Sequence, residues 1–144
     1  MRRILLAIVA VLAMGALAAC GAGEKNDYIE QVNSLQSTAQ TEISTLMSSV
    51  NPGADPAAAG TAITALADRA DKLATDIEAL DAPEDFAEGD GELVKAWKDF
   101  AETCRTAATA ITAGDLTGAM DSLGKLTEIQ PRGAAAVDSI NNAR

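Results

Sequence analysis

The chain of 144 residues contains no histidine. Histidine is the general base of Ser-His-Asp and Cys-His sites and a common ligand of zinc and haem iron, so its absence excludes these classes of site. Aromatic residues are also few, with one Trp, one Tyr and two Phe. A hydrophobic core must therefore be built mainly from aliphatic side chains.

Basic residues are scarce as well, with 11 Lys and Arg against 21 Asp and Glu and a net charge of -10. Arg2 and Arg3 are the only charged residues up to position 20, so the remainder keeps 9 basic and 21 acidic residues, a net charge of -12. A surface this acidic repels phosphate backbones and anionic headgroups. We therefore expect no nucleic-acid partner.

The N-terminus carries a short basic and apolar segment. Met1-Arg2-Arg3 is followed by 16 uncharged, mainly apolar residues, Ile4 to Ala19, somewhat fewer than the roughly 20 of a membrane-spanning helix. This pattern is typical of an export signal. Leu17-Ala18-Ala19-Cys20 resembles the lipobox of bacterial lipoproteins, in which the cysteine is lipidated and the signal is cut immediately before it.

The lipobox resemblance implies a domain order and a location. Residues 1–19 would be the removed signal peptide, and residues 20–25 would be the lipidated Cys20 with a short linker. The lipid on Cys20 would bind the cell membrane and hold the protein on its extracytoplasmic face, because two or more acyl chains give stable anchoring.

Residues 26–144 show four segments with apolar residues three and four positions apart, which is the spacing of one face of an α-helix. No segment shows the alternation of a β-strand. The sequence therefore predicts an all-α fold, an antiparallel up-down-up-down four-helix bundle. The four stripes are Ile29, Val32, Gln36, Ala39, Ile43, Leu46 and Val50; Ala59, Ile63, Leu66, Ala70, Leu73, Ile77 and Leu80; Leu93, Trp97, Phe100, Cys104, Ala107 and Ile111; and Leu116, Ala119, Leu123, Leu126, Gln130, Gly133, Val137 and Ile140.

Cap and turn residues predict helices at about 27–50, 56–80, 90–113 and 115–141. The third helix could begin at Pro83, but Gly89 and Gly91 favour a short turn at 83–88 and a start near 90. Gly114 and Asp115 provide a C-cap and an N-cap between the last two helices. Pro131 predicts a kink at about 127–132 in the fourth helix.

The Ala-, Thr- and Asp-rich bundle behind a lipobox resembles small extracytoplasmic lipoproteins of high-GC Gram-positive bacteria. The motifs T-A-G-D at 112–115 and L-D-A-P-E at 80–84 add to this resemblance. The resemblance implies no established activity.

Two glutamines and the tryptophan lie on the apolar stripes. Gln36 and Gln130 each lie 14 residues from the same end of the bundle, which is roughly 21 Å along antiparallel helices, and Trp97 falls in the same layer. We expect the three to converge, with the indole N–H reaching a glutamine carbonyl. One interpretation is a buried polar layer that fixes helix register, and the other is a small ligand pocket beside the Pro131 kink.

The remaining candidate groups favour structural roles. Cys104 is expected to be an inert core residue, because no second soft ligand or basic activating group is evident. Six acidic residues between 81 and 92 are interpreted as a solvated charged face, since they lack the spacing of a calcium-binding loop. We expect no resident metal or cofactor. The six are Asp81, Glu84, Asp85, Glu88, Asp90 and Glu92.

Together these features favour a membrane-anchored extracytoplasmic lipoprotein that is not an enzyme and acts as an interaction or envelope-associated bundle with an unknown protein partner. The alternative is a binding module for a small apolar or amphipathic ligand in the bundle core. A core cavity of a few hundred Å³ would favour the alternative.

Overall fold

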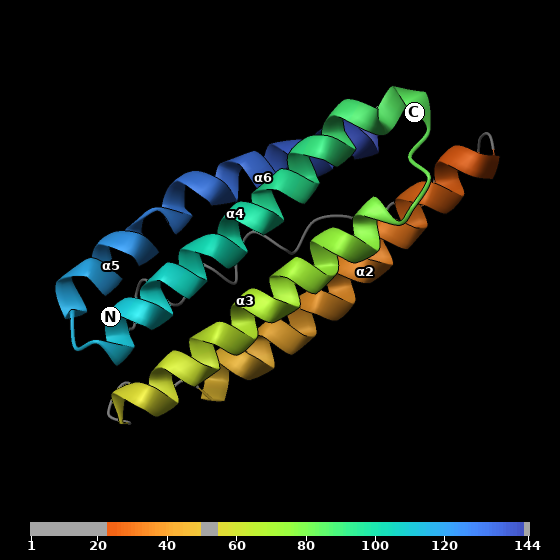
Figure 1. The fold of residues 1–144 in the computed structure, drawn as a ribbon. Coiled ribbons are helices and arrows are strands. Elements are labelled where there is room, and N and C mark those ends of the chain that lie inside the picture. Colours follow the sequence, from red (N-terminus) through yellow and green to blue (C-terminus); the bar gives the residue numbers. More distant parts are fainter. Residues whose placement is uncertain (1–22, 50–54, 143–144) are drawn as a thin grey trace.

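The computed structural model of the protein describes residues 23–49 and 55–142. These residues form α2 (Gly23–Ser49), α3 (Pro56–Glu78), the 3₁₀ helix η2 (Glu84–Phe86), α4 (Ala87–Thr112), α5 (Leu116–Gly124) and α6 (Leu126–Asn142), with no strand in the described ranges. Figure 1 shows α2, α3, α4 and the α5–α6 run lying lengthwise along one another in alternating directions. The predicted all-α, up-down-up-down bundle is confirmed, with α5 and α6 together as its fourth helix.

The predicted signal segment 1–19 and Cys20 lie outside the described residues. In the described part of the chain, no helix combines the length and the apolar character needed to cross a membrane.

Helix α2 begins about one turn earlier than the sequence indicated. Gly23, Glu24 and Lys25, which were expected to belong to the linker, are helical. Contacts with the α3–α4 connection stabilise this turn, because Lys25 pairs with Asp85 and its ammonium lies 5.8 Å from the centre of the Phe86 ring. The predicted start at residue 27 was therefore wrong, since it considered only local capping signals.

Helix α4 also begins earlier, at Ala87, and continues through Gly89 and Gly91. Gly89 is buried where α4 approaches α6, and a Cβ there would lie 3.0 Å from Cγ1 of Ile140. The close approach between helices thus uses the missing side chain. Packing of Gly89 against α6 offsets the low helix propensity that predicted a start near 90.

The fourth helix is interrupted at Lys125, and α6 runs without a break through residues 127–132, where the sequence predicts a kink. Pro131 lies inside α6 and cannot donate a hydrogen bond to the preceding turn. The interruption follows Gly124, and glycine has a low helix propensity. Around it the backbone N–H groups of Lys125 and Glu128 donate three residues back, to Ser122 and Lys125 respectively.

The described hydrophobic core contains residues from all the long helices, from Tyr28 of α2 to Ile140 of α6. Its most extensive pairing joins α3 and α4, whose buried faces are rich in alanine, while α2 packs mainly on α3 and α6 mainly on α4. Gly60 of α3 permits a close approach, since a Cβ there would lie 3.2 Å from the carbonyl oxygen of Ala108. Leu116, predicted as a core residue, is instead 66% exposed.

The turn between α4 and α5 follows the predicted chemistry. Gly114 has a φ of +79°, in the region that favours glycine, directly after α4 ends. Asp115 caps α5 by accepting a hydrogen bond of 2.9 Å from the backbone N–H of Gly118. This tight reversal sends α5 back along α4.

Candidate functional site

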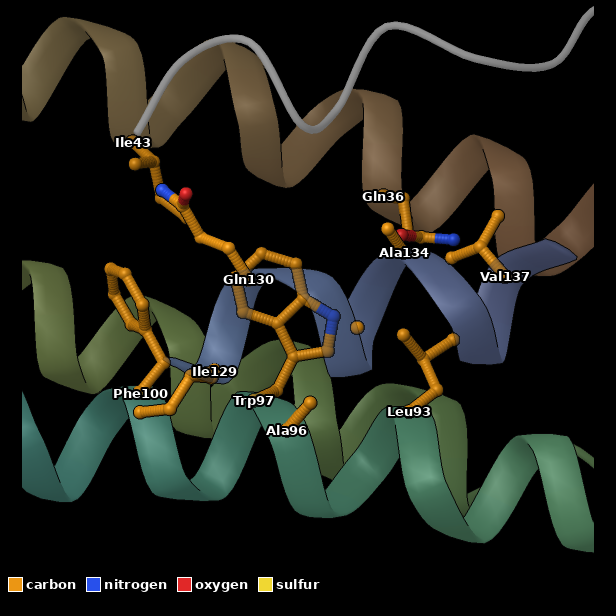
Figure 2. A pocket seen from close by; sticks show the side chains of 11 residues that line it. Gln36, Ile43, Leu93, Ala96, Trp97, Phe100, Ile129, Gln130, Ala134 and Val137 are labelled. Atoms are coloured by element: carbon orange, nitrogen blue, oxygen red, sulfur yellow. The ribbon is translucent and has the colours of Figure 1, made fainter. Parts of the chain in front are cut away.

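An apolar pocket of about 70 Å³ lies between α2, α4 and α6. Figure 2 shows the side chains that reach into it from these three helices. The pocket exists because α2 packs mainly on α3 and α6 mainly on α4, so that α2 and α6 enclose a space that neither fills. It is lined by Gln36, Ile43, Leu93, Ala96, Trp97, Phe100, Ile129, Gln130, Gly133, Ala134 and Val137.

The structure brings Gln36, Trp97 and Gln130 to this one pocket. Gln36 and Gln130 are half-buried, while Trp97 is only 9% exposed. Their convergence follows from helix geometry, because equal distances from one end of the bundle place residues of antiparallel helices in the same layer.

The hydrogen bond predicted for the indole is absent. The Nε1–H of Trp97 is buried and has no hydrogen-bond partner in the described part of the protein. In Figure 2 the amide of Gln130 points toward Ile43 of α2, while the indole nitrogen lies on the far side of its ring. Side chains that lie in the same layer of a bundle can still point in different directions. Trp97 instead makes an edge contact with Phe100, with ring centres 5.8 Å apart.

Among the described residues, none that lines the pocket has a titratable side chain. Arg132 pairs with Asp99 at 2.6 Å, and both line a different, polar hollow of α4 and α6. The pocket is therefore an uncharged, largely apolar surface with three polar groups, namely one indole N–H and two carboxamides.

Cys104 lies in the core of α4 and is 2% exposed, which is where its position in the stripe predicted it. Burial raises the pKa of its thiol to about 12, and the nearby charge of Arg105 opposes this only in part. The reactive species is the thiolate, so this cysteine is unreactive at neutral pH.

The acidic cluster at 81–92 makes contacts with the first turns of α2. Asp85 pairs with Lys25, and Asp90 accepts a hydrogen bond from the hydroxyl of Tyr28. Burial raises the pKa of Tyr28 above its usual range, and the bond to Asp90 adds to this shift. Among the described residues, no group of three or more Cys, Asp or Glu side chains is placed to hold a metal ion.

The apolar stripes did not indicate which small residues would line the pocket. Ala96 and Ala134 lie beside the apolar stripes and carry no signal that separates them from the other alanines. Gly133 lies on the fourth stripe, and a Cβ there would be only in ordinary contact, 3.7 Å from Cβ of Ala96. These three residues leave the space that larger side chains would fill.

Comparison of the chain with protein-family models, curated proteins and solved structures finds no match. The fold and the site together define an all-α bundle with an apolar pocket between its helices. Its function is inferred from these residues and from the N-terminal motif.

Proposed function

We propose that the protein is a lipid-anchored binding protein on the extracytoplasmic face of the cell membrane, with the pocket between α2, α4 and α6 as its binding site for a small apolar ligand. The observation that carries this proposal is the buried indole N–H of Trp97, which lines an apolar pocket and has no partner among the described residues. Buried donors are usually hydrogen-bonded, so an unpaired one at a pocket indicates a missing acceptor.

The anchoring part of the proposal depends on the N-terminal sequence. Leu17-Ala18-Ala19-Cys20 follows a basic and apolar export signal, and Cys20 would carry the lipid. Helix α2 begins at Gly23, so only a few residues separate the lipid from the bundle. The bundle would therefore stand close to the membrane surface.

The pocket volume limits the size of the ligand. The pocket holds about 70 Å³, less than the few hundred Å³ that would by itself favour a ligand-binding core, so the proposal rests on the unpaired N–H of Trp97 and not on volume. The pocket accommodates a small molecule or one end of a longer one. The role is non-enzymatic, because the lining residues include no nucleophile and no titratable acid or base.

A second candidate function is docking of a protein partner, which is favoured by two exposed apolar side chains. Leu116 and Met120 lie one turn apart on α5 and are 66% and 59% exposed. Large apolar side chains grouped on a surface are typical of contact sites. This face lies at the end of the bundle opposite the start of α2 (Figure 1).

Native mass spectrometry of the protein purified from its own host tests these alternatives. A mass corresponding to a Cys20-lipidated chain, lost in a Cys20→Ser variant, is the expected result for anchoring. An additional small mass that survives gentle activation supports ligand binding, and a co-purifying chain supports the docking role. An unlipidated chain without additional mass would contradict both parts of the main proposal.

A further inference from the structure

The pocket wall is largely apolar and holds one fully buried donor, the indole N–H of Trp97, beside the half-buried carboxamides of Gln36 and Gln130. Trp97 is 9% exposed, and its Nε1–H is closed to solvent and has no partner in the described ranges, so a ligand oxygen reaches it only when neighbouring side chains shift. Figure 2 shows its ring extending from α4 into the space bounded by α2 and α6. Leaving a buried donor unpaired is unfavourable, so a ligand that supplies an acceptor gains more here than one that does not.

The lining chemistry limits what kind of acceptor fits. Leu93, Phe100 and Ile129 line the same pocket with hydrocarbon, and none of the described lining residues is cationic and able to balance an anion. The chain after Cys20 also carries a net charge of -12, which repels anions at a distance. A carboxylate or phosphate would therefore lose its hydration without gaining a counter-charge.

We propose that the pocket selects uncharged molecules that combine an apolar body with a carbonyl oxygen, as ketones, esters and amides do, and that the carbonyl accepts a hydrogen bond from Nε1–H of Trp97. This inference rests on the proposed ligand-binding function and specifies its chemistry. Trp97 acts as the specificity residue, and the hydrocarbon wall supplies the affinity.

The pocket has room for a carbonyl group and a few carbon atoms. The rest of a longer ligand would lie in the open mouth of the pocket. The volume of about 70 Å³ is also enough for water, which needs at least about 10–15 Å³. Water is thus the competing occupant. A buried water needs two to four polar partners, and the indole N–H and the two carboxamides supply that number, so the experiment has to distinguish water from the ketone.

Trp97 is the only tryptophan in the chain, so its indole N–H gives a single NMR resonance that reports directly on the proposed contact. The protein for this test is the full chain of 144 residues. The probes are 2-heptanone and 2-methyl-1-heptene, which differ only in a carbonyl oxygen replaced by a methylene group. The titration is repeated with Trp97→Phe, which removes the donor, and with Val137→Ala, which enlarges the pocket but keeps the donor.

We expect 2-heptanone to move the indole proton resonance downfield and 2-methyl-1-heptene to leave it nearly unchanged. Trp97→Phe should weaken ketone binding relative to alkene binding by about fivefold, the worth of one hydrogen bond, and Val137→Ala should preserve the wild-type ratio. The wild-type titration does not depend on any variant folding.

Three results would overturn the inference. Binding of both probes without an indole shift, or with a ratio that Trp97→Phe leaves unchanged, removes the carbonyl preference but leaves the binding function standing. A cross-peak between the indole proton and a long-lived water that persists in saturating ketone assigns the site to water. Failure of both probes to bind up to their solubility limits contradicts the proposed binding function as well.

Discussion

The two sides of the bundle are built differently. Alanine is the most frequent residue among the buried positions of α3 and α4, and Ala67, Ala70 and Ala74 of α3 are completely buried. On the side of α2 and α6, larger and polar residues enclose a pocket, and Gln36 and Gln130 remain half-buried. Small side chains let α3 and α4 approach closely, whereas the larger side chains and carboxamides of α2, α4 and α6 border a pocket. The α3–α4 pairing is therefore the scaffold, and the α2–α6 side carries the site.

The largest expected difference between the two sides is in the cost of removing a side chain. Leu73 of α3 is completely buried, so Leu73→Ala should lower the free energy of unfolding by about 2–5 kcal/mol. Val137→Ala beside the pocket should cost no more than about 1.5 kcal/mol, because Val137 is half-buried and borders an existing space. Urea unfolding followed by circular dichroism measures both, and equal losses would remove the distinction between the sides.

Adding side-chain volume should also change the stability by different amounts on the two sides of the bundle. Ala70→Leu inserts a larger side chain into a filled seam and should cost about 1–3 kcal/mol. Ala134→Leu points into the pocket and should leave stability nearly unchanged while abolishing ligand binding. Thermal melts of the two variants give the comparison. An Ala134→Leu variant as unstable as Ala70→Leu would mean that the pocket cannot accept added volume.

Alkaline pH should weaken the fully buried core through Cys104. Because folding raises the pKa of this thiol to about 12, its stabilising contribution is present below the usual pKa near 9 and is lost as pH rises toward 12. The protein should lose about 1.4 kcal/mol between pH 8 and pH 10 from this group. Urea unfolding across that range, with Cys104→Ala as the control that lacks this slope, measures it. Identical pH profiles for both proteins would show that the thiol ionises freely in the fold.

The smallest effect is expected from adding one methyl group at a glycine. Gly133→Ala should stabilise the protein by about 0.5–1 kcal/mol, because the new Cβ has room beside Ala96 and alanine favours the helix. Gly60→Ala on the α3–α4 side should destabilise it, since its Cβ would press on Thr112 and on the carbonyl oxygen of Ala108. Differential scanning calorimetry resolves shifts of this size. Stabilisation by both substitutions would show that the α3–α4 seam has unused space.

Much of the fold was predictable, because the order of apolar residues defines helices and the short connections define antiparallel neighbours. Gly114 and Asp115 were correctly assigned, since caps act locally. The starts of α2 and α4 were missed because they depend on partners distant in sequence, such as Lys25 with Asp85 and Gly89 with Ile140. Local capping signals contain no information on such contacts.

The candidate site was predictable in position but not in chemistry. Counting residues along antiparallel helices placed Gln36, Trp97 and Gln130 in one layer, and all three line the pocket. The expected indole hydrogen bond was wrong, because side-chain orientation depends on the packing of the whole layer. The unpaired N–H, which carries the functional proposal, could be recognised only in the folded structure.

Hydrogen–deuterium exchange of the full chain, with and without saturating 2-heptanone, tests most directly whether the α2–α6 side is the binding side. We expect slower exchange in peptides from α2 and α6 when the ketone is present, with no change in α3. Protection confined to α3, or no protection of α2 and α6 at saturation, would contradict it.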